Sequence, residues 1–331
     1  MQRKQTQNAQ AAPVLEISHL SISFRQYDRG TKQTTLSTIR DLSVAVRAGE
    51  LVAVVGSSGS GKSLLAHAVL GILPYNAEMG GEILYQGKPL DKKRVEKLRG
   101  REIVLIPQST SYLDPLMKIG RQIVPDKSDK GKIEKRKGIF KRYHLEEKTA
   151  ELYPFELSGG MTRRILISTA LVEEPKLVIA DEPTPGLDLT TARRAMEHFR
   201  ECADNGAGVL LITHDLELAM ETADRIVVFY AGTTIEKTAA GAFRDGKSLS
   251  HPYSRALWRA LPQNGFSSIP GTQPYVKDLP EGCPFGPRCE RFGKGCGGEI
   301  PKTPTKTGWV KCIYPCEEDA AGHDETGGNN R

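Results

Sequence analysis

The sequence lacks any apolar run long enough to cross a bilayer, for which roughly 18 consecutive apolar residues are needed. Its first residues, MQRKQTQNAQAAP, also lack the apolar segment of a secretory signal peptide. We therefore predict a protein that is not secreted. Any role at a membrane requires a partner that spans it.

Neither sign of charge dominates, because the chain has 46 Lys and Arg and 40 Asp and Glu, which gives a formal net charge of +6. In the most basic stretch, KGKIEKRKGIFKR (130–142), Glu134 and the apolar residues Ile133, Ile139 and Phe140 interrupt the basic residues. This pattern favours a solvated helix with one apolar face over a nucleic-acid-binding patch. We predict no nucleic-acid partner.

Cysteine is scarce over most of the chain. Cys202 stands alone within a helical pattern, and we predict that it packs in the core. The other five of the six cysteines lie between residues 283 and 316. In the absence of a signal peptide, this grouping indicates metal or redox chemistry in place of a disulfide framework.

Short β-branched strand patterns alternate with helical patterns up to about residue 225. The strand patterns are residues 14–24, 50–56, 81–87, 101–108, 176–181 and 208–214, and the helical patterns are residues 62–73, 161–174, 190–205 and 215–225. The later strands do not alternate between apolar and polar residues, which is typical of a buried parallel sheet. This order predicts an α/β fold with right-handed crossovers.

Differences in composition and in hydrophobic pattern divide the chain into parts. We predict disordered tails over residues 1–12 and 317–331, a main domain over residues 13–245, and a Gly-, Pro- and Cys-rich extension over residues 246–316. Within the main domain, a charged stretch without strand patterns predicts a small helical insert at about residues 111–160.

The most specific motif is GSSGSGKS (56–63), which follows a strand pattern and precedes a helical one. It matches G-x-x-x-x-G-K-[ST], in which backbone N–H groups surround phosphates, Lys62 contacts the β- and γ-phosphates, and Ser63 ligates Mg²⁺. The alternative is an ordinary glycine-rich turn. The predicted nucleotide ligands are Gly56, Ser57, Ser58, Gly59, Ser60, Gly61, Lys62 and Ser63.

Polar side chains also stand where three other strand patterns end. In LVIADEP (177–183), Asp181 is a candidate Mg²⁺ ligand and Glu182 a candidate catalytic base for the attacking water. His214 ends LLITH and either faces the γ-phosphate or is a structural histidine. Gln108 ends REIVLIPQ, and its amide either holds a water or Mg²⁺ or is an exposed loop amide.

Two short segments suggest further contacts to an anion. LSGGM (157–161) places Ser158, Gly159 and Gly160 at the start of an apolar helical pattern, where backbone N–H groups and the helix dipole favour anions. PGLD (185–188) ends in Asp188 and follows the strand end that carries the two acidic residues.

In their order along the chain, the six motifs (GSSGSGKS, Gln108, LSGGM, LVIADEP, PGLD and THD) resemble those of the ATP-binding subunits of ABC transporters. The resemblance covers about residues 13–245, although Met161 stands where the family has Gln. The resemblance implies a P-loop NTPase fold with a mostly parallel core sheet, an antiparallel β subdomain and a helical insert. It also implies that two ATPase domains meet head to tail. Ser158, Gly159 and Gly160 of one domain would then contact the γ-phosphate held by the other, and Asp188 would support the interface.

The resemblance also implies an aromatic platform for adenine. Phe24 is the first choice and Tyr27 the second, although Phe24 could equally be an apolar strand residue.

The C-terminal part narrows the resemblance. HPYSRAL (251–257) and GCPFGPRC (282–289) resemble the extension of oligopeptide, dipeptide and nickel importer ATPases. This implies an ATPase that powers import of peptides or of nickel or metal-chelate-like solutes. Its partners would be a second ATPase subunit (a homologous chain or a second copy), two permeases at the cytoplasmic side of the membrane and, indirectly, an extracytoplasmic solute-binding protein. The insert and Gln108 would contact the permeases.

The alternative function is a soluble, non-transport ABC ATPase that acts on nucleic acid or ribosomes. Such proteins usually carry two ATPase domains or a long insertion, whereas this chain has one set of motifs.

The resemblance extends to the cysteines of the extension. Cys283, Cys289, Cys296 and Cys312 fit the spacing of a [4Fe–4S] cluster found in some dipeptide-type importer ATPases, and Cys316 is the spare. Four thiolates also suit Zn²⁺, and reduced cysteines that pack as small apolar residues are a third possibility.

Overall fold

The structure is a computed structural model, and it describes residues 12–27, 30–57 and 59–316. The predicted ligand Ser58 lies outside the described residues, as do the predicted tail 317–331 and residues 1–11 of the other predicted tail.

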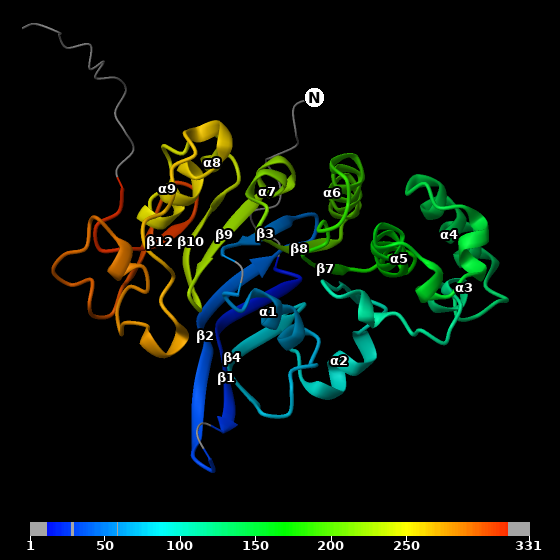
Figure 1. The fold of residues 1–331 in the computed structure, drawn as a ribbon, viewed down its shortest axis with the longest axis horizontal. Helices are drawn as coiled ribbons and strands as arrows, with labels where there is room; N and C mark the ends of the chain where they lie inside the picture. The colour runs from blue at the N-terminus through cyan, green and yellow to red at the C-terminus, as the bar shows by residue number, and fades with distance from the viewer. Residues whose placement is uncertain (1–11, 28–29, 58, 317–331) are drawn as a thin grey trace, which may run out of the picture.

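The strands form one continuous sheet (Figure 1) in the order β5-β4-β1-β2-β10-β9-β3-β8-β7-β6, and β12 pairs with both β10 and β11. The strands are β1 (Leu15–Tyr27), β2 (Gln33–Val46), β3 (Leu51–Val55), β4 (Ala77–Tyr85), β5 (Lys88–Pro89), β6 (Ile103–Ile106), β7 (Leu177–Asp181), β8 (Gly208–Thr213), β9 (Arg225–Tyr230), β10 (Thr233–Ala239), β11 (Lys302–Pro304) and β12 (Trp309–Lys311).

Helices cover this sheet and extend it at one end. The helices are α1 (Lys62–Val69), α2 (Lys92–Leu98), α3 (Ile119–Ile123), α4 (Lys130–Arg142), α5 (Gly159–Leu171), α6 (Leu189–Asp204), α7 (Leu216–Thr222), α8 (Ala242–Asp245) and α9 (Pro252–Arg259). Among the described residues, no helix is both long and apolar enough to cross a membrane.

The centre of the sheet is parallel and buried on both faces. β6, β7, β8, β3 and β9 pair in parallel. Successive side chains of β3 point to opposite faces, so Val52 and Val54 pack in a core with α1, whereas Ala53 and Val55 pack in a second core with α5, α6 and α7. This burial on both faces explains why the later strand patterns are continuously apolar.

β1 pairs antiparallel with β2 and β4, and this antiparallel part completes the predicted ABC-type fold. Several strands were not among the predicted patterns: β2, β5, β9, β10, β11 and β12. The predicted helix 62–73 ends earlier, at Val69, because Gly71 has a φ of 62° in the left-handed region. The predicted helix 215–225 also ends early, because β9 begins at Arg225.

The helical segment and the extension lie at opposite ends of the long axis of the molecule (Figure 1). α4 coincides with the basic stretch 130–142 and buries Phe140, while its charged residues are exposed or half-buried. The extension is joined to the main sheet, because β12 pairs with β10. In addition, the buried Glu236 of β10 accepts hydrogen bonds from the backbone N–H groups of Ser250, at 2.8 Å, and His251, at 2.9 Å.

Candidate functional site

The phosphate loop connects β3 to α1, as the motif predicts. Two of its glycines are required by geometry. A Cβ on Gly56 would lie 2.1 Å from the carbonyl oxygen of Phe229, and Gly61, the N-cap of α1, has a φ of 91°. Glycine therefore allows the loop to pack against β9 and to turn into the helix.

Lys62 extends back along this loop. Its Nζ donates hydrogen bonds to the carbonyl oxygens of Gly56, at 2.9 Å, and Ser57, at 2.8 Å. Burial lowers the pKa of Lys62, and the nearby carboxylates of Glu182 and Asp181 oppose this shift. A triphosphate at the loop would favour the charged ammonium in the same way.

Ser63 and Asp181 meet across the site, although they are distant in sequence. The Ser63 Oγ donates a hydrogen bond to Asp181 Oδ1 over 3.1 Å. Burial raises the pKa of Asp181, and the hydrogen bond from Ser63 opposes this shift. A hydroxyl and a carboxylate oxygen are ligands that suit Mg²⁺, so this pair fits the predicted metal.

Glu182 and His214 also come together. Glu182 is 6% exposed and has a φ of 46°, which directs the backbone away from β7. Its Oε2 lies 2.8 Å from Nδ1 of His214, at the end of the neighbouring strand β8. The two predicted catalytic side chains therefore share one edge of the sheet with the phosphate loop. Gln108 is exposed, and no hydrogen bond between described residues joins it to Ser63, Asp181 or Glu182.

The other predicted anion-binding residues lie at helix N-termini. Ser158 caps α5, where its Oγ accepts a hydrogen bond from the N–H of Met161 at 3.3 Å, and both Ser158 and Gly159 are exposed. Asp188 caps α6 and accepts a hydrogen bond from the N–H of Thr191 at 3.0 Å. Both caps thus have a structural role that is independent of any partner, and their contacts to nucleotide stay predictions.

The two candidate adenine platforms differ in exposure. Phe24 of β1 is half-buried against the hydrophobic core, whereas Tyr27 is 69% exposed. The choice between them stays a prediction.

One residue of the site was missed from the sequence. Arg163 of α5 is 5% exposed, and its Nη1 donates a hydrogen bond to the carbonyl oxygen of Pro107 at 2.7 Å. Burial lowers its pKa, which the carboxylates of Asp181 and Glu182 oppose. The available signal was an arginine within the apolar run of the helix. A buried guanidinium needs hydrogen-bond acceptors or carboxylates nearby, so its position pointed to such a site.

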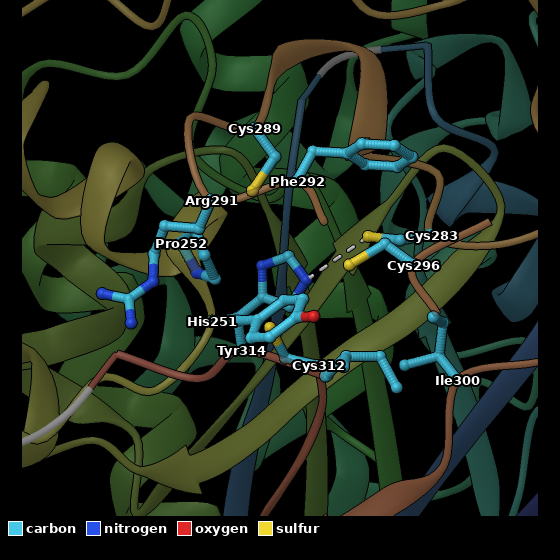
Figure 2. A pocket seen from close by; sticks show the side chains of 12 residues that line it. His251, Pro252, Cys283, Cys289, Arg291, Phe292, Cys296, Ile300, Cys312 and Tyr314 are labelled. Atoms are coloured by element: carbon cyan, nitrogen blue, oxygen red, sulfur yellow. Dashed lines mark hydrogen bonds between the residues drawn. The ribbon is translucent and has the colours of Figure 1, made fainter. Parts of the chain in front are cut away.

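The four predicted metal-binding cysteines, Cys283, Cys289, Cys296 and Cys312, line one pocket of the extension (Figure 2). The cavity that these side chains enclose is small, about 10 Å³. His251 also lines it, with Nε2 at 4.0 Å from the Sγ of Cys283. Cys316 lines a second hollow instead, and its role as the spare stays a prediction.

The cysteines of the chain are all free thiols. Cys202 is half-buried against the core, as predicted, and burial raises its pKa to about 11. Burial also raises the pKa of Cys312 to about 12. In the described part of the chain, no group of three or more His, Cys, Asp or Glu side chains is arranged to hold a metal ion. The four thiols therefore line one pocket, but they are not arranged around one common point where an ion could bind.

Comparison with known proteins agrees with both parts of the chain. Residues 39–185 match the ABC transporter family, and residues 244–296 match the family described as oligopeptide/dipeptide transporter, C-terminal region. The oligopeptide transport ATP-binding protein OppD of Salmonella typhimurium is 34% identical over 340 residues, covering 95% of this chain and 97% of that protein. A putative peptide import ATP-binding protein of Brucella melitensis is 32% identical over 337 residues, covering 93% of this chain and 99% of that protein.

Solved structures share the fold of the main domain. An ATP-binding subunit of an ABC transporter superimposes with a TM-score of 0.58 at 26% identity, covering 70% of this chain and 92% of that one. A dimeric ATP-binding cassette bound to ADP and Pi gives a TM-score of 0.59 at 24% identity, covering 68% and 98%.

These relatives do not support the alternative of an ATPase that acts on nucleic acid or ribosomes. The two family matches cover the phosphate loop, the two acidic residues and most of the extension. The chain therefore belongs to the ATP-binding proteins of ABC transporters, in the group that carries the oligopeptide/dipeptide transporter C-terminal region.

Proposed function

We propose that this protein hydrolyses ATP to power an importer of peptides. The observation that carries the proposal is the convergence of Lys62, Ser63, Asp181, Glu182 and His214 at one edge of the sheet. The names of the relatives, which are transport ATP-binding proteins for oligopeptides or peptides, support the choice of cargo.

The residues of the site divide the chemistry between them. The loop N–H groups and Lys62 hold the β- and γ-phosphates, and Ser63 and Asp181 hold Mg²⁺. When bound, Mg²⁺ neutralises charge on the phosphates. Glu182 orients the attacking water and accepts its proton, while His214 fixes the Glu182 carboxylate at 2.8 Å. The Gln108 amide would hold Mg²⁺ or the attacking water.

The site is completed by a second ATPase subunit, either a homologous chain or another copy. The exposed Ser158 and Gly159, with Gly160, would contact the γ-phosphate held by the partner, and Asp188 would support the interface. Phe24 would stack on adenine, with Tyr27 as the second candidate. ATP then holds the dimer together, and its hydrolysis releases it.

We further propose that two permease subunits bind this pair at the cytoplasmic side of the membrane and receive the solute from a binding protein outside. In this scheme residues 13–245 form the nucleotide-binding domain, with its helical insert at about 111–160 contacting the permeases. Residues 246–316 form the extension. Nickel or a metal chelate is the other candidate cargo.

Transport in a reconstituted system tests this function. The chain is co-expressed with candidate permeases and a candidate second ATPase, and the complex is placed in vesicles with a candidate binding protein. ATP should drive uptake of a labelled oligopeptide. The same complex with Glu182→Gln should not transport. Uptake of nickel but not of peptide would show that nickel is the cargo, and absence of ATP-driven uptake of either solute would contradict the proposal.

For the extension, we propose that Cys283, Cys289, Cys296 and Cys312 hold a [4Fe–4S] cluster. Thiolates are its usual ligands, and the four cysteines line one pocket, which supports the proposal. Zn²⁺ is the alternative ion for the same four thiols. Such a centre would fix a segment that has little apolar core of its own.

Anaerobic purification tests the cluster. The protein should absorb at about 400 nm and contain iron and sulfide. Cys289→Ser should lose the cluster, whereas the control Cys316→Ser should keep it. A colourless protein with stoichiometric zinc would show that the thiols bind zinc and not a cluster. A protein that contains neither metal would show that the thiols are packing residues.

A further inference from the structure

The extension touches the phosphate loop directly, at Ser57. The Ser57 hydroxyl donates a hydrogen bond to Oε1 of Gln273, which follows it by 216 residues. The hydroxyl of Tyr253, in α9, also interacts with the side chain and main chain of Ser57. Two side chains of the extension therefore converge on one residue of the loop.

Tyr253 is held firmly in this position. It is 2% exposed, and its backbone N–H donates to Nδ1 of His251 at 3.0 Å. Its ring packs 4.5 Å from that of Tyr230 and 5.4 Å from that of Phe285, measured between centroids. Burial raises the pKa of Tyr253 to about 12, which the interaction with Ser57 opposes, so the hydroxyl is neutral at physiological pH.

The segment that carries Gln273 is fixed by Arg288. The Arg288 Nε donates to the carbonyl oxygen of Pro270 at 2.7 Å, and its Nη2 donates to that of Ile269 at 3.0 Å. Its Nη1 lies 3.3 Å from the hydroxyl of Tyr230. Arg288 thus links the Gln273 segment to the aromatic cluster that holds Tyr253.

Ser57 is a sensitive point at which to hold the loop. Lys62 Nζ donates to the Ser57 carbonyl oxygen at 2.8 Å, so the orientation of this peptide bears on the lysine that contacts phosphate. A side chain fixed from outside reduces the conformations of the backbone on the inside. Such preorganisation lowers the entropic cost of binding a ligand.

We infer that Tyr253 and Gln273 are positioning residues that hold the phosphate loop through Ser57, so that the extension sets the nucleotide affinity of the main domain. This role goes beyond the proposed function and rests on it only in requiring that the loop bind nucleotide.

The test compares four variants of the full chain by their Kd for Mg·ATP and Mg·ADP. Tyr253→Phe removes only a buried hydroxyl, and Gln273→Ala removes the acceptor. Each should weaken binding about two- to tenfold, the range of one neutral hydrogen bond. The controls Tyr275→Phe and Gln263→Ala change exposed residues of the extension and should bind as the wild type does. In hydrolysis assays KM should rise while kcat changes less.

A double-mutant cycle separates positioning from general stabilisation. On a Ser57→Ala background, Gln273→Ala should cause little further loss, because its partner is already absent. Wild-type affinity in both Tyr253→Phe and Gln273→Ala, or fully additive losses with Ser57→Ala, would overturn the inference. Failure of the proposed function is distinct, because the wild-type chain would then bind no nucleotide and Lys62→Ala would change nothing.

Discussion

The nucleotide site and the cysteine pocket both gather side chains from distant parts of the chain, but they hold them differently. In the nucleotide site, a hydrogen bond of 3.1 Å joins Ser63 to Asp181, and Nδ1 of His214 lies 2.8 Å from Oε2 of Glu182. In the cysteine pocket, the thiol of Cys283 lies 4.0 Å from the His251 ring. The first site is set by the ends of parallel strands, whereas turns and three-residue strands carry the second.

This difference indicates what each site needs from its ligand. A buried parallel sheet fixes its strand ends through its own packing, so the nucleotide site exists before nucleotide arrives. A segment with little apolar core depends more on what its side chains bind. The predictions below test this contrast.

The largest expected effect concerns Glu182. Glu182→Gln keeps the shape of the side chain but removes the base, so hydrolysis should fall about 10²- to 10⁴-fold. ATP binding should persist, and a closed dimer should accumulate. Phosphate release by the complex with the permeases measures the loss, with the exposed Glu197→Gln on α6 as the matched control. Turnover near that of the wild type would exclude Glu182 as the essential base.

Removal of metal should act on one region only. In anaerobic protein treated with a chelator, hydrogen exchange should increase over residues 283–312, because the extension loses the centre that fixes it. Exchange in β3 and β8 should stay slow, since these strands are buried on both faces. Equal protection of residues 283–312 with and without metal would contradict the proposed dependence of the extension on its metal centre.

A smaller effect concerns two helix caps. Asp188 accepts from the N–H of Thr191 at 3.0 Å, and Asp129, the cap of α4, accepts from the N–H of Lys132 at 2.9 Å. Replacement of either by Ala should lower the free energy of unfolding by about 1 kcal/mol. Only Asp188→Ala should also weaken ATP-dependent dimerisation, measured by sedimentation. Equal dimerisation of both variants would leave Asp188 as a cap alone.

The sequence signals of the candidate nucleotide site are local, and the structure brings these side chains together. The phosphate loop is contiguous, and Asp181, Glu182 and His214 each end a strand pattern that the structure confirms. The contacts of Ser57 with Tyr253 and Gln273 could not be predicted, since they depend on how the extension packs. β11 and β12 were missed because three residues are too few to show periodicity.

The central claim is that the phosphate loop of this chain binds ATP. Calorimetric titration of Mg·ATP into the purified wild type and into Lys62→Ala tests it most directly. The wild type should bind saturably, and the variant about tenfold to a hundredfold more weakly, because a charge-assisted contact to phosphate is lost. Equal affinity of the two proteins would contradict the assignment of this loop.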